Sequence, residues 1–151
     1  MGMPKSVTKI KKGNVEFISN VDKVQYTLKE LTRAALRDTG KFICNKFRTQ
    51  YYGIFKRKKG KVGRYTQYWV RSKQESPDLQ VGLKPFAFYG GFQELGSSRT
   101  KKLGLLQKTV NENIDQIRII QGKYLSAIED ENRARGLIDS ESDYEGGADG
   151  K

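Results

Sequence analysis

The stretch FYGGFQELGSSRTKKLGLLQKTVNENI, residues 88–114, joins an aromatic segment to an apolar-periodic run through a polar loop. Pro85 opens a short helical turn before it, and Gly96 follows Leu95 as a helix stop. After the loop, side chains at three- and four-residue steps predict a long amphipathic helix. Its expected inner face is formed by Leu106, Val110, Ile114, Ile117, Gln121, Tyr124 and Ile128.

A second long helix is expected nearer the N-terminus. Apolar residues recur at helical spacing from Val21 to Ile54, and Asn20 is a plausible N-cap. About 30 residues at about 1.5 Å each give a rod about 45 Å long. Gly40 lies inside this run and is expected to bend the helix.

Between the two helices, the sequence alternates as strands do. RYTQYWVRS (64–72) and DLQVGLK (78–84) flank turn residues, and NVEFIS (14–19) reads as a further short strand. KRKKGKVGR (56–64) reads as a loop. The predicted fold class is therefore α+β, a small antiparallel sheet with two long helices packed on it.

Charge divides the 151-residue chain, whose net charge is +12. Residues 129–151 have a net charge of −5, whereas the other 128 residues carry +17. We therefore expect a basic, mobile N-terminal arm (1–13), a single α+β domain (14–135) and an acidic, Gly-rich tail without its own core (136–151). A net charge of +17 on residues 1–128 favours a polyanion or an acidic protein surface as the partner. The alternative is that the charge serves only to keep the protein soluble.

The amino-acid composition excludes several common kinds of enzyme active site. The chain has no histidine and one cysteine, Cys44, which excludes an internal disulfide, a cysteine metal cage and histidine-based catalysis. We expect no cofactor, no metal and no catalytic residue. No apolar run reaches the roughly 20 residues of a membrane span, and the N-terminus lacks the apolar core of a secretory signal. A cytoplasmic product without membrane contact is expected.

The first candidate site is the basic loop between the first helix and the hairpin. Its cations could neutralise phosphates and the flanking aromatics could stack on bases, a pattern that favours non-specific backbone contact. The alternative is a solvated loop whose aromatic neighbours belong to the core. The candidate contacts to DNA or an acidic partner are Lys56, Arg57, Lys58, Lys59, Lys61 and Arg64.

Glu94 is the second candidate. A single carboxylate without a partner acid is a poor acid–base catalyst, so a structural role is favoured. Its oxygens are expected to accept backbone N–H groups from GSSRT (96–100), where Gly96 can adopt positive φ. The alternative is a small nuclease that pairs Glu94 with Arg or Lys. The two glycines of YGG do not form a dinucleotide-binding loop.

Several of these segments resemble a known family. KVGRYTQYWVRS (61–72) matches its TGRL-type strand start, FYGGFQELGSS (88–98) its aromatic–Glu–Gly segment, and LGLLQKTVNENIDQI (103–117) its final helix. The chain is similar over about residues 20–128 to the HK97-type, gene-product-ten-like tail-completion or head–tail joining proteins of long-tailed bacteriophages. Two departures are a Gly104 where that family has prolines before the last helix, and an unusually basic KRKK.

The resemblance implies a non-enzymatic virion protein of the phage neck or tail, assembled in the host cytoplasm. Such proteins form rings around the DNA channel, with six-fold symmetry expected, and contact other neck and tail proteins. The structural motif would be Phe88, Tyr89, Phe92, Glu94 and Gly96, locking one edge of the sheet. The candidate inter-subunit loop, expected to order against a neighbour, is Ser97, Ser98, Arg99, Thr100, Lys101 and Lys102.

Two questions stay open at this point. A stand-alone, non-specific nucleic-acid-binding module is the alternative function, and it predicts tight, salt-sensitive binding by the isolated monomer. The acidic tail is either disordered and screened, or it folds back or reaches a neighbouring subunit.

Overall fold

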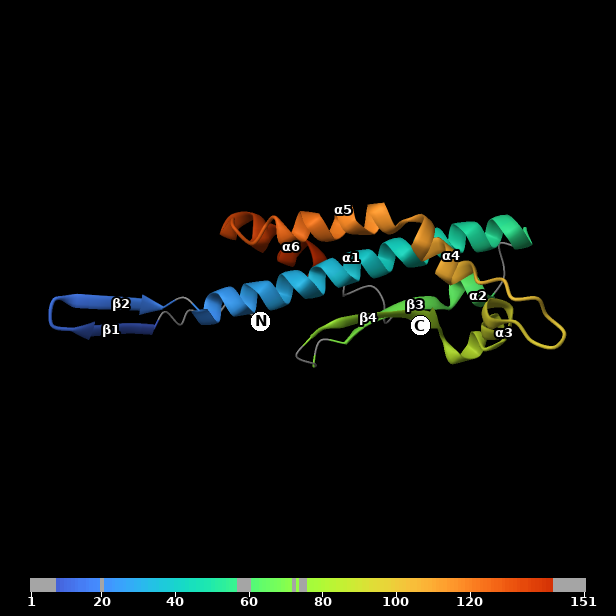
Figure 1. The fold of residues 1–151 in the computed structure, drawn as a ribbon, viewed down its shortest axis with the longest axis horizontal. Helices are drawn as coiled ribbons and strands as arrows, with labels where there is room; N and C mark the ends of the chain where they lie inside the picture. The colour runs from blue at the N-terminus through green and yellow to red at the C-terminus, as the bar shows by residue number, and fades with distance from the viewer. Residues whose placement is uncertain (1–7, 20, 57–60, 72, 74–75, 143–151) are drawn as a thin grey trace. The chain divides into compact units, whose positions relative to one another are not determined.

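The computed structural model shows an α+β chain, as predicted, and describes residues 8–19, 21–56, 61–71, 73 and 76–142 (Figure 1). It divides into two compact units. The central unit is Ala35–Gly122, and the terminal unit combines Met1–Ala34 with Lys123–Lys151. The longest helix, α1 (Val21–Phe55), contributes residues to both units.

Helix α1 confirms the predicted first long helix, but it continues through Gly40 without a break. A Cβ at Gly40 would lie 2.6 Å from the ring of Tyr68. The glycine therefore does not interrupt the helix. It removes a side chain so that an aromatic ring of the hairpin can contact the helix backbone.

The predicted hairpin is confirmed as β3 (Thr66–Arg71) and β4 (Asp78–Leu83), which pair antiparallel. Tyr68 lies opposite Val81, and Thr66 lies opposite Leu83. Thr66 is buried and its hydroxyl donates a hydrogen bond to the Val62 carbonyl (2.7 Å). One face of the hairpin thus belongs to the core of the central unit.

Short helices flank the hairpin. Residues 61–64 form α2 (Lys61–Arg64), a helical turn within the segment predicted as a loop. Downstream lie the predicted turn, η1 (Pro85–Ala87), and α3 (Tyr89–Leu95), which ends at Gly96 with φ of 84°. A Cβ at Gly90 would lie 2.5 Å from Leu83, so this glycine permits α3 to pack against β4.

The predicted second long helix is wrong in one respect, because it is two helices: α4 (Leu105–Glu112) and α5 (Ile114–Leu125). The break is at Asn113, whose side-chain amide donates to the Thr109 carbonyl (2.8 Å). The buried face is also shifted. The buried side chains of α4 are Leu105 and Thr109 rather than Leu106 and Val110.

The core of the central unit is aromatic and aliphatic. Its buried cluster consists of Phe47, Tyr51, Val62, Ala87 and Leu105. Phe47 and Tyr51 lie one turn apart on α1 and their rings stack at 5.8 Å. Elements on both sides of the hairpin therefore converge on one stretch of α1.

Part of each predicted chain end has secondary structure. Within the expected arm, residues 8–12 form β1 (Thr8–Lys12), which pairs antiparallel with β2 (Val15–Ser19), the predicted short strand. The expected tail begins inside a helix, α6 (Glu131–Ser142). Asp130 accepts hydrogen bonds from the N–H groups of Asn132 and Arg133, which accounts for the start of α6. The predicted N-cap Asn20 lies outside the described residues.

The side chains buried in the terminal unit are mostly small. They are Leu31, Ala34, Tyr124, Ala127 and Ala134. Among the helices that the structure describes, none is both long and apolar enough to span a bilayer.

Candidate functional site

The structure places three of the six predicted basic contacts. Lys56 follows the end of α1 with φ of 48°, and Arg64 ends α2; both are exposed. Lys61 begins α2. Arg57, Lys58 and Lys59 lie outside the described residues. The described part of the basic segment is therefore helical at its downstream end.

Arg48, a residue that the sequence analysis did not select, holds this segment in place. Its guanidinium donates to the carbonyl of Gly63 (2.9 Å) and to that of Thr66 (2.7 Å). These carbonyls belong to the end of α2 and the start of β3. Hydrogen bonds from a charged donor are about twice as strong as neutral ones, so Arg48 fixes the position of both elements against α1.

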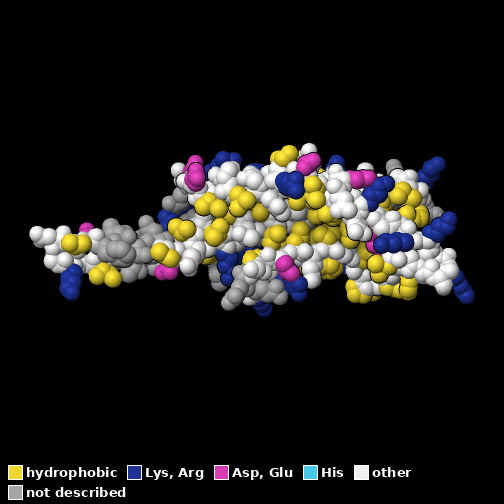
Figure 2. Space-filling view, viewed as in Figure 1, with side chains coloured by type: hydrophobic (Ala, Val, Ile, Leu, Met, Phe, Trp, Pro, Cys, Tyr) yellow, Lys and Arg dark blue, Asp and Glu magenta, His cyan; other side chains and the backbone are white. Residues whose placement is uncertain are grey.

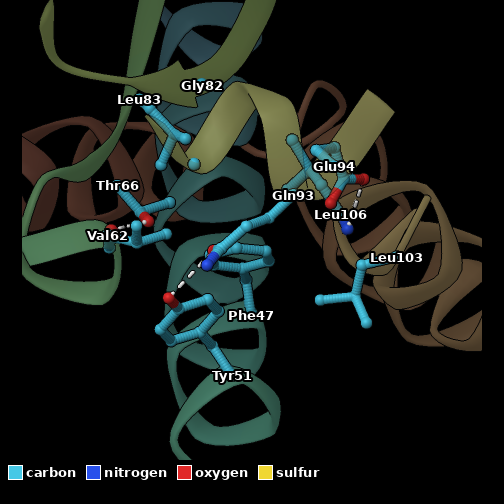
Figure 3. Close-up of a pocket in the computed structure, with 11 residues that line it drawn as sticks. Phe47, Tyr51, Val62, Thr66, Gly82, Leu83, Gln93, Glu94, Leu103 and Leu106 are labelled. Carbon is cyan, nitrogen blue, oxygen red and sulfur yellow. Dashed lines mark hydrogen bonds between the residues drawn. The ribbon is translucent and has the colours of Figure 1, made fainter. Parts of the chain in front are cut away.

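Glu94 has the structural chemistry that was predicted, but at a different place. Its Oε1 accepts hydrogen bonds from the backbone N–H groups of Leu106 (2.7 Å) and Gln107 (3.2 Å), not from residues 96–100 (Figure 3). These are the second and third residues of α4, whose own N-cap, Gly104, has no side chain to accept them. A carboxylate at this position also interacts favourably with the helix dipole. Glu94 therefore caps α4 from α3 and does not lock an edge of the sheet.

The 96–104 loop is closed by its own hydrogen bonds. The Leu103 N–H donates to the Gln93 carbonyl (2.8 Å), and the Gly104 N–H donates to the Glu94 carbonyl (3.1 Å). At the tip, the Ser97 hydroxyl accepts from the N–H groups of Arg99 and Thr100. Ser97 to Lys102 are all exposed. The predicted inter-subunit loop is thus exposed at its tip and held at its base by hydrogen bonds within the chain.

The aromatic segment of η1 and α3 faces solvent. Phe86 is 74% exposed, Phe88 71%, Phe92 54% and Leu95 76%. Phe88, Phe92 and Leu95 follow helical spacing, and the rings of Phe88 and Phe92 meet edge to face at 6.4 Å. These three residues are called the apolar stripe below. Figure 2 shows hydrophobic side chains gathered over the η1–α3 region.

An open groove of about 460 Å³ begins at the end of the apolar stripe. Leu95 belongs to both, and the groove continues along β4 and α4, with Lys102 and Glu94 among its lining residues. The apolar part of its lining is Ile43, Leu79, Val81, Leu95, Leu106 and Val110. Its volume falls within the ~300–1,000 Å³ range of pockets that hold ligands. Leu79 and Val81 are only half-buried, so β4 offers apolar side chains to the groove.

A second cavity lies deeper in the central unit, between α1, α2, β4 and α3 (Figure 3). Its volume is about 20 Å³, room for about one water molecule. On its wall the Tyr51 hydroxyl donates to Gln93 Oε1 (3.0 Å). Burial raises the pKa of Tyr51 above its ordinary value of 10.0, so the hydroxyl keeps the proton it donates. Phe47, Tyr51 and Val62 of its lining belong to the buried core cluster, so this cavity is part of the core.

The described residues do not bring together three or more His, Cys, Asp or Glu side chains that could hold a metal ion. Cys44 is buried, and burial raises the pKa of its thiol above the ordinary 9.0. A protonated, buried thiol is a poor nucleophile. The chemistry that this surface offers is therefore apolar contact and positive charge.

No protein-family description, curated protein or solved structure matched the chain.

The sequence analysis selected Phe88, Phe92 and Glu94 but missed the groove and the exposure of Leu95. The sequence did contain one sign that Leu95 is exposed. Residues 96–102 include no apolar side chain, so the loop that follows Leu95 cannot cover it. The groove itself could not be predicted, because it depends on how α4 is placed by Glu94.

Proposed function

We propose that this chain is a structural virion protein of a tailed bacteriophage. It forms or joins a ring at the head–tail junction, or at the head-proximal end of the tail, around the DNA channel. The proposal rests on the sequence resemblance described above and on one structural observation: the apolar stripe is exposed and continuous with an open apolar groove. An apolar surface of this kind is typical of a site that another protein covers.

The stripe is suited to such a role because it is rigid. Gly90 contacts Leu83 and Val62 closely, and the 96–104 loop is tied back to α3 at two carbonyls. A preordered surface loses little conformational entropy when it is covered. Ring contacts are heterologous, so one copy must present two different surfaces, and the stripe with its groove supplies one of them.

Positive charge fits the channel part of the proposal. The central unit carries 18 basic and 6 acidic side chains, a net charge of +12, which equals that of the whole chain. Non-specific phosphate contacts exchange readily and weaken with salt, as a channel for moving DNA requires. An acidic neighbouring ring would use the same cations.

The first test is a copy count in purified particles of the phage that encodes the chain, by quantitative mass spectrometry against the portal protein. A ring-like number, about six or about twelve, supports the proposal. Absence from particles together with abundance in infected cells would remove it.

The second test disrupts the stripe. Phe88→Ser with Leu95→Ser is expected to leave the fold intact, because both side chains are more than two-thirds exposed, and to reduce the yield of infectious particles at least about tenfold. Ile119→Ser is the matched control, since Ile119 is 64% exposed on α5, outside the stripe and groove. Equal yields from the stripe and control variants would contradict the role of the stripe.

The concentration of charge in the central unit also favours the alternative, a stand-alone nucleic-acid-binding module. It predicts that the purified monomer binds duplex or single-stranded DNA tightly, with affinity falling steeply as salt rises. Replacing the six basic residues at positions 56–64 by Ser should then abolish binding. If the purified monomer does not bind DNA near physiological salt, this alternative is excluded.

A further inference from the structure

The apolar stripe and its groove lie in basic surroundings. From Lys84 to Gly104 the sequence has four basic residues: Lys84, Arg99, Lys101 and Lys102. The one acid of that segment, Glu94, already accepts two backbone N–H groups of α4. Lys102 lines the groove itself. The surface therefore favours an occupant with an apolar anchor and negative charge around it.

This chain contains such a segment. Residues 139–149 have five acids and no base: Asp139, Glu141, Asp143, Glu145 and Asp149. Tyr144 stands between Asp143 and Glu145, an aromatic side chain flanked directly by acids. Its ring can fill an apolar groove while the adjacent carboxylates lie near cations at the rim.

The segment has enough length to use the whole surface. Helix α6 ends at Ser142, and nine residues, 143–151, follow it. Nine extended residues reach up to about 30 Å. This length is several times the pitch of about 5.4 Å of the one helical turn between Phe88 and Phe92. One such segment can therefore extend well beyond a single helical turn of the apolar stripe.

We propose that residues 143–149 of one copy bind the apolar stripe and groove of a second copy, with Tyr144 in the groove and the acids near Lys102, Lys101 and Arg99. The two surfaces of this contact differ, so it is heterologous and propagates into a ring or a chain. It deepens the proposed function by naming the partner of the stripe. Its test uses purified protein alone and does not depend on a phage particle.

The binding test uses the chain ending at Ser142 and a fluorescently labelled peptide of residues 137–151, followed by anisotropy. The peptide is expected to bind, and to bind about tenfold more weakly when salt is raised from about 50 to about 500 mM. Leu95→Ser and Lys102→Glu in the protein, or Tyr144→Ser in the peptide, should each weaken binding about tenfold or more. Ile119→Ser and Arg118→Glu are matched controls on α5 and should change nothing. No binding, or binding insensitive to the Leu95 and Lys102 variants, overturns the proposal.

A second experiment identifies the copy that supplies the segment. The full-length chain should associate in sedimentation velocity at concentrations where the chain ending at Ser142 stays monomeric. A full-length Leu95→Ser, Lys102→Glu variant, which keeps the segment but not the surface, should pair with the shortened chain. If the full-length chain stays monomeric at its highest soluble concentration, the assignment of the segment to a second copy is overturned. If that monomer also fails to bind the labelled peptide, the surface is occupied by the segment of the same chain.

Discussion

In the central unit, large side chains fill the core; among the residues of the terminal unit whose burial is described, three of the five buried apolar side chains are alanines. The terminal unit instead leaves large apolar side chains in solvent. Val21, Val24 and Leu28, near the start of α1, are exposed. The central unit can thus be stabilised by a core of large side chains, whereas the described buried residues of the terminal unit contribute less apolar volume.

The two units also differ in net charge. The terminal unit has 11 basic and 11 acidic side chains and no net charge, so the central unit alone accounts for the net charge of the chain. A net charge of this size destabilises a compact state through repulsion, so the central unit needs its well-packed core to offset that cost. The comparison teaches that the apolar stripe, its groove and the aromatic core that supports them belong to one unit.

The largest expected effect comes from Phe47→Ala, which should lower the free energy of unfolding by about 3–5 kcal/mol, because it removes a ring at the centre of the aromatic cluster. Leu31→Ala, the corresponding deletion in the terminal unit, should cost about 2 kcal/mol. Urea denaturation measures both. A loss at Leu31 equal to that at Phe47 would break the comparison between the units.

Glycine-to-alanine substitutions test how closely the central unit is packed. Gly40→Ala and Gly90→Ala should each cost about 1–3 kcal/mol, since the new Cβ would lie within 2.6 Å of Tyr68 or Leu83. Gly53→Ala and Gly91→Ala are matched controls in the same two helices, where no atom lies within 4 Å, and should stabilise by about 0.5–1 kcal/mol. Thermal denaturation distinguishes the pairs. Because Ala has the higher helix propensity, stabilisation by all four substitutions would contradict the close contacts at Gly40 and Gly90.

Glu94→Ala should cost about 0.5–2 kcal/mol, because two N–H groups of α4 lose their acceptor. Hydrogen exchange should accelerate at Leu106 and Gln107 before it does elsewhere in α4. Glu112→Gln, at the opposite end of the same helix, is the control and should leave these amides protected. Unchanged exchange in Glu94→Ala would show that the cap is dispensable.

The smallest effect is expected for the exposed ion pair of the hairpin. The Arg71 guanidinium donates two hydrogen bonds to Asp78 and lowers the pKa of that carboxyl below its ordinary 3.8. A lowered folded-state pKa adds stability above the unfolded value that is lost as pH falls through the folded value. The stability of Asp78→Asn should therefore depend slightly less on pH below about 4. Parallel acid denaturation curves for the two proteins would contradict this.

The sequence predicted the elements that depend on local pattern. Helix α1, the β3–β4 hairpin and the stop at Gly96 follow from periodicity, alternation and turn residues. The break at Asn113 was missed because apolar residues continue on either side of it with helical spacing. What ends α4 is an amide–carbonyl hydrogen bond, which periodicity does not register.

For the candidate site, the sequence predicted the kind of interaction that Glu94 makes but not its partners. Glu94 was expected to accept backbone N–H groups, yet its partners are 12 and 13 residues away and belong to the next helix. The buried face of α4 was misplaced by one residue, since Leu105 and Leu106 are equally apolar. Thr109 decides it: its hydroxyl donates to Gln50 Oε1 on α1 (2.5 Å), a contact between residues 59 apart.

The closed base of the 96–104 loop has a practical consequence for visualising assembly. Because hydrogen bonds from Leu103 and Gly104 seal the loop where it leaves α3, its tip can be lengthened without opening α3 or α4. Each doubling of a flexible loop costs only about 0.6 kcal/mol. A short epitope or dye-acceptor peptide inserted between Ser98 and Arg99 would mark this surface of every copy, and its accessibility to an antibody before and after assembly would report when that surface is covered.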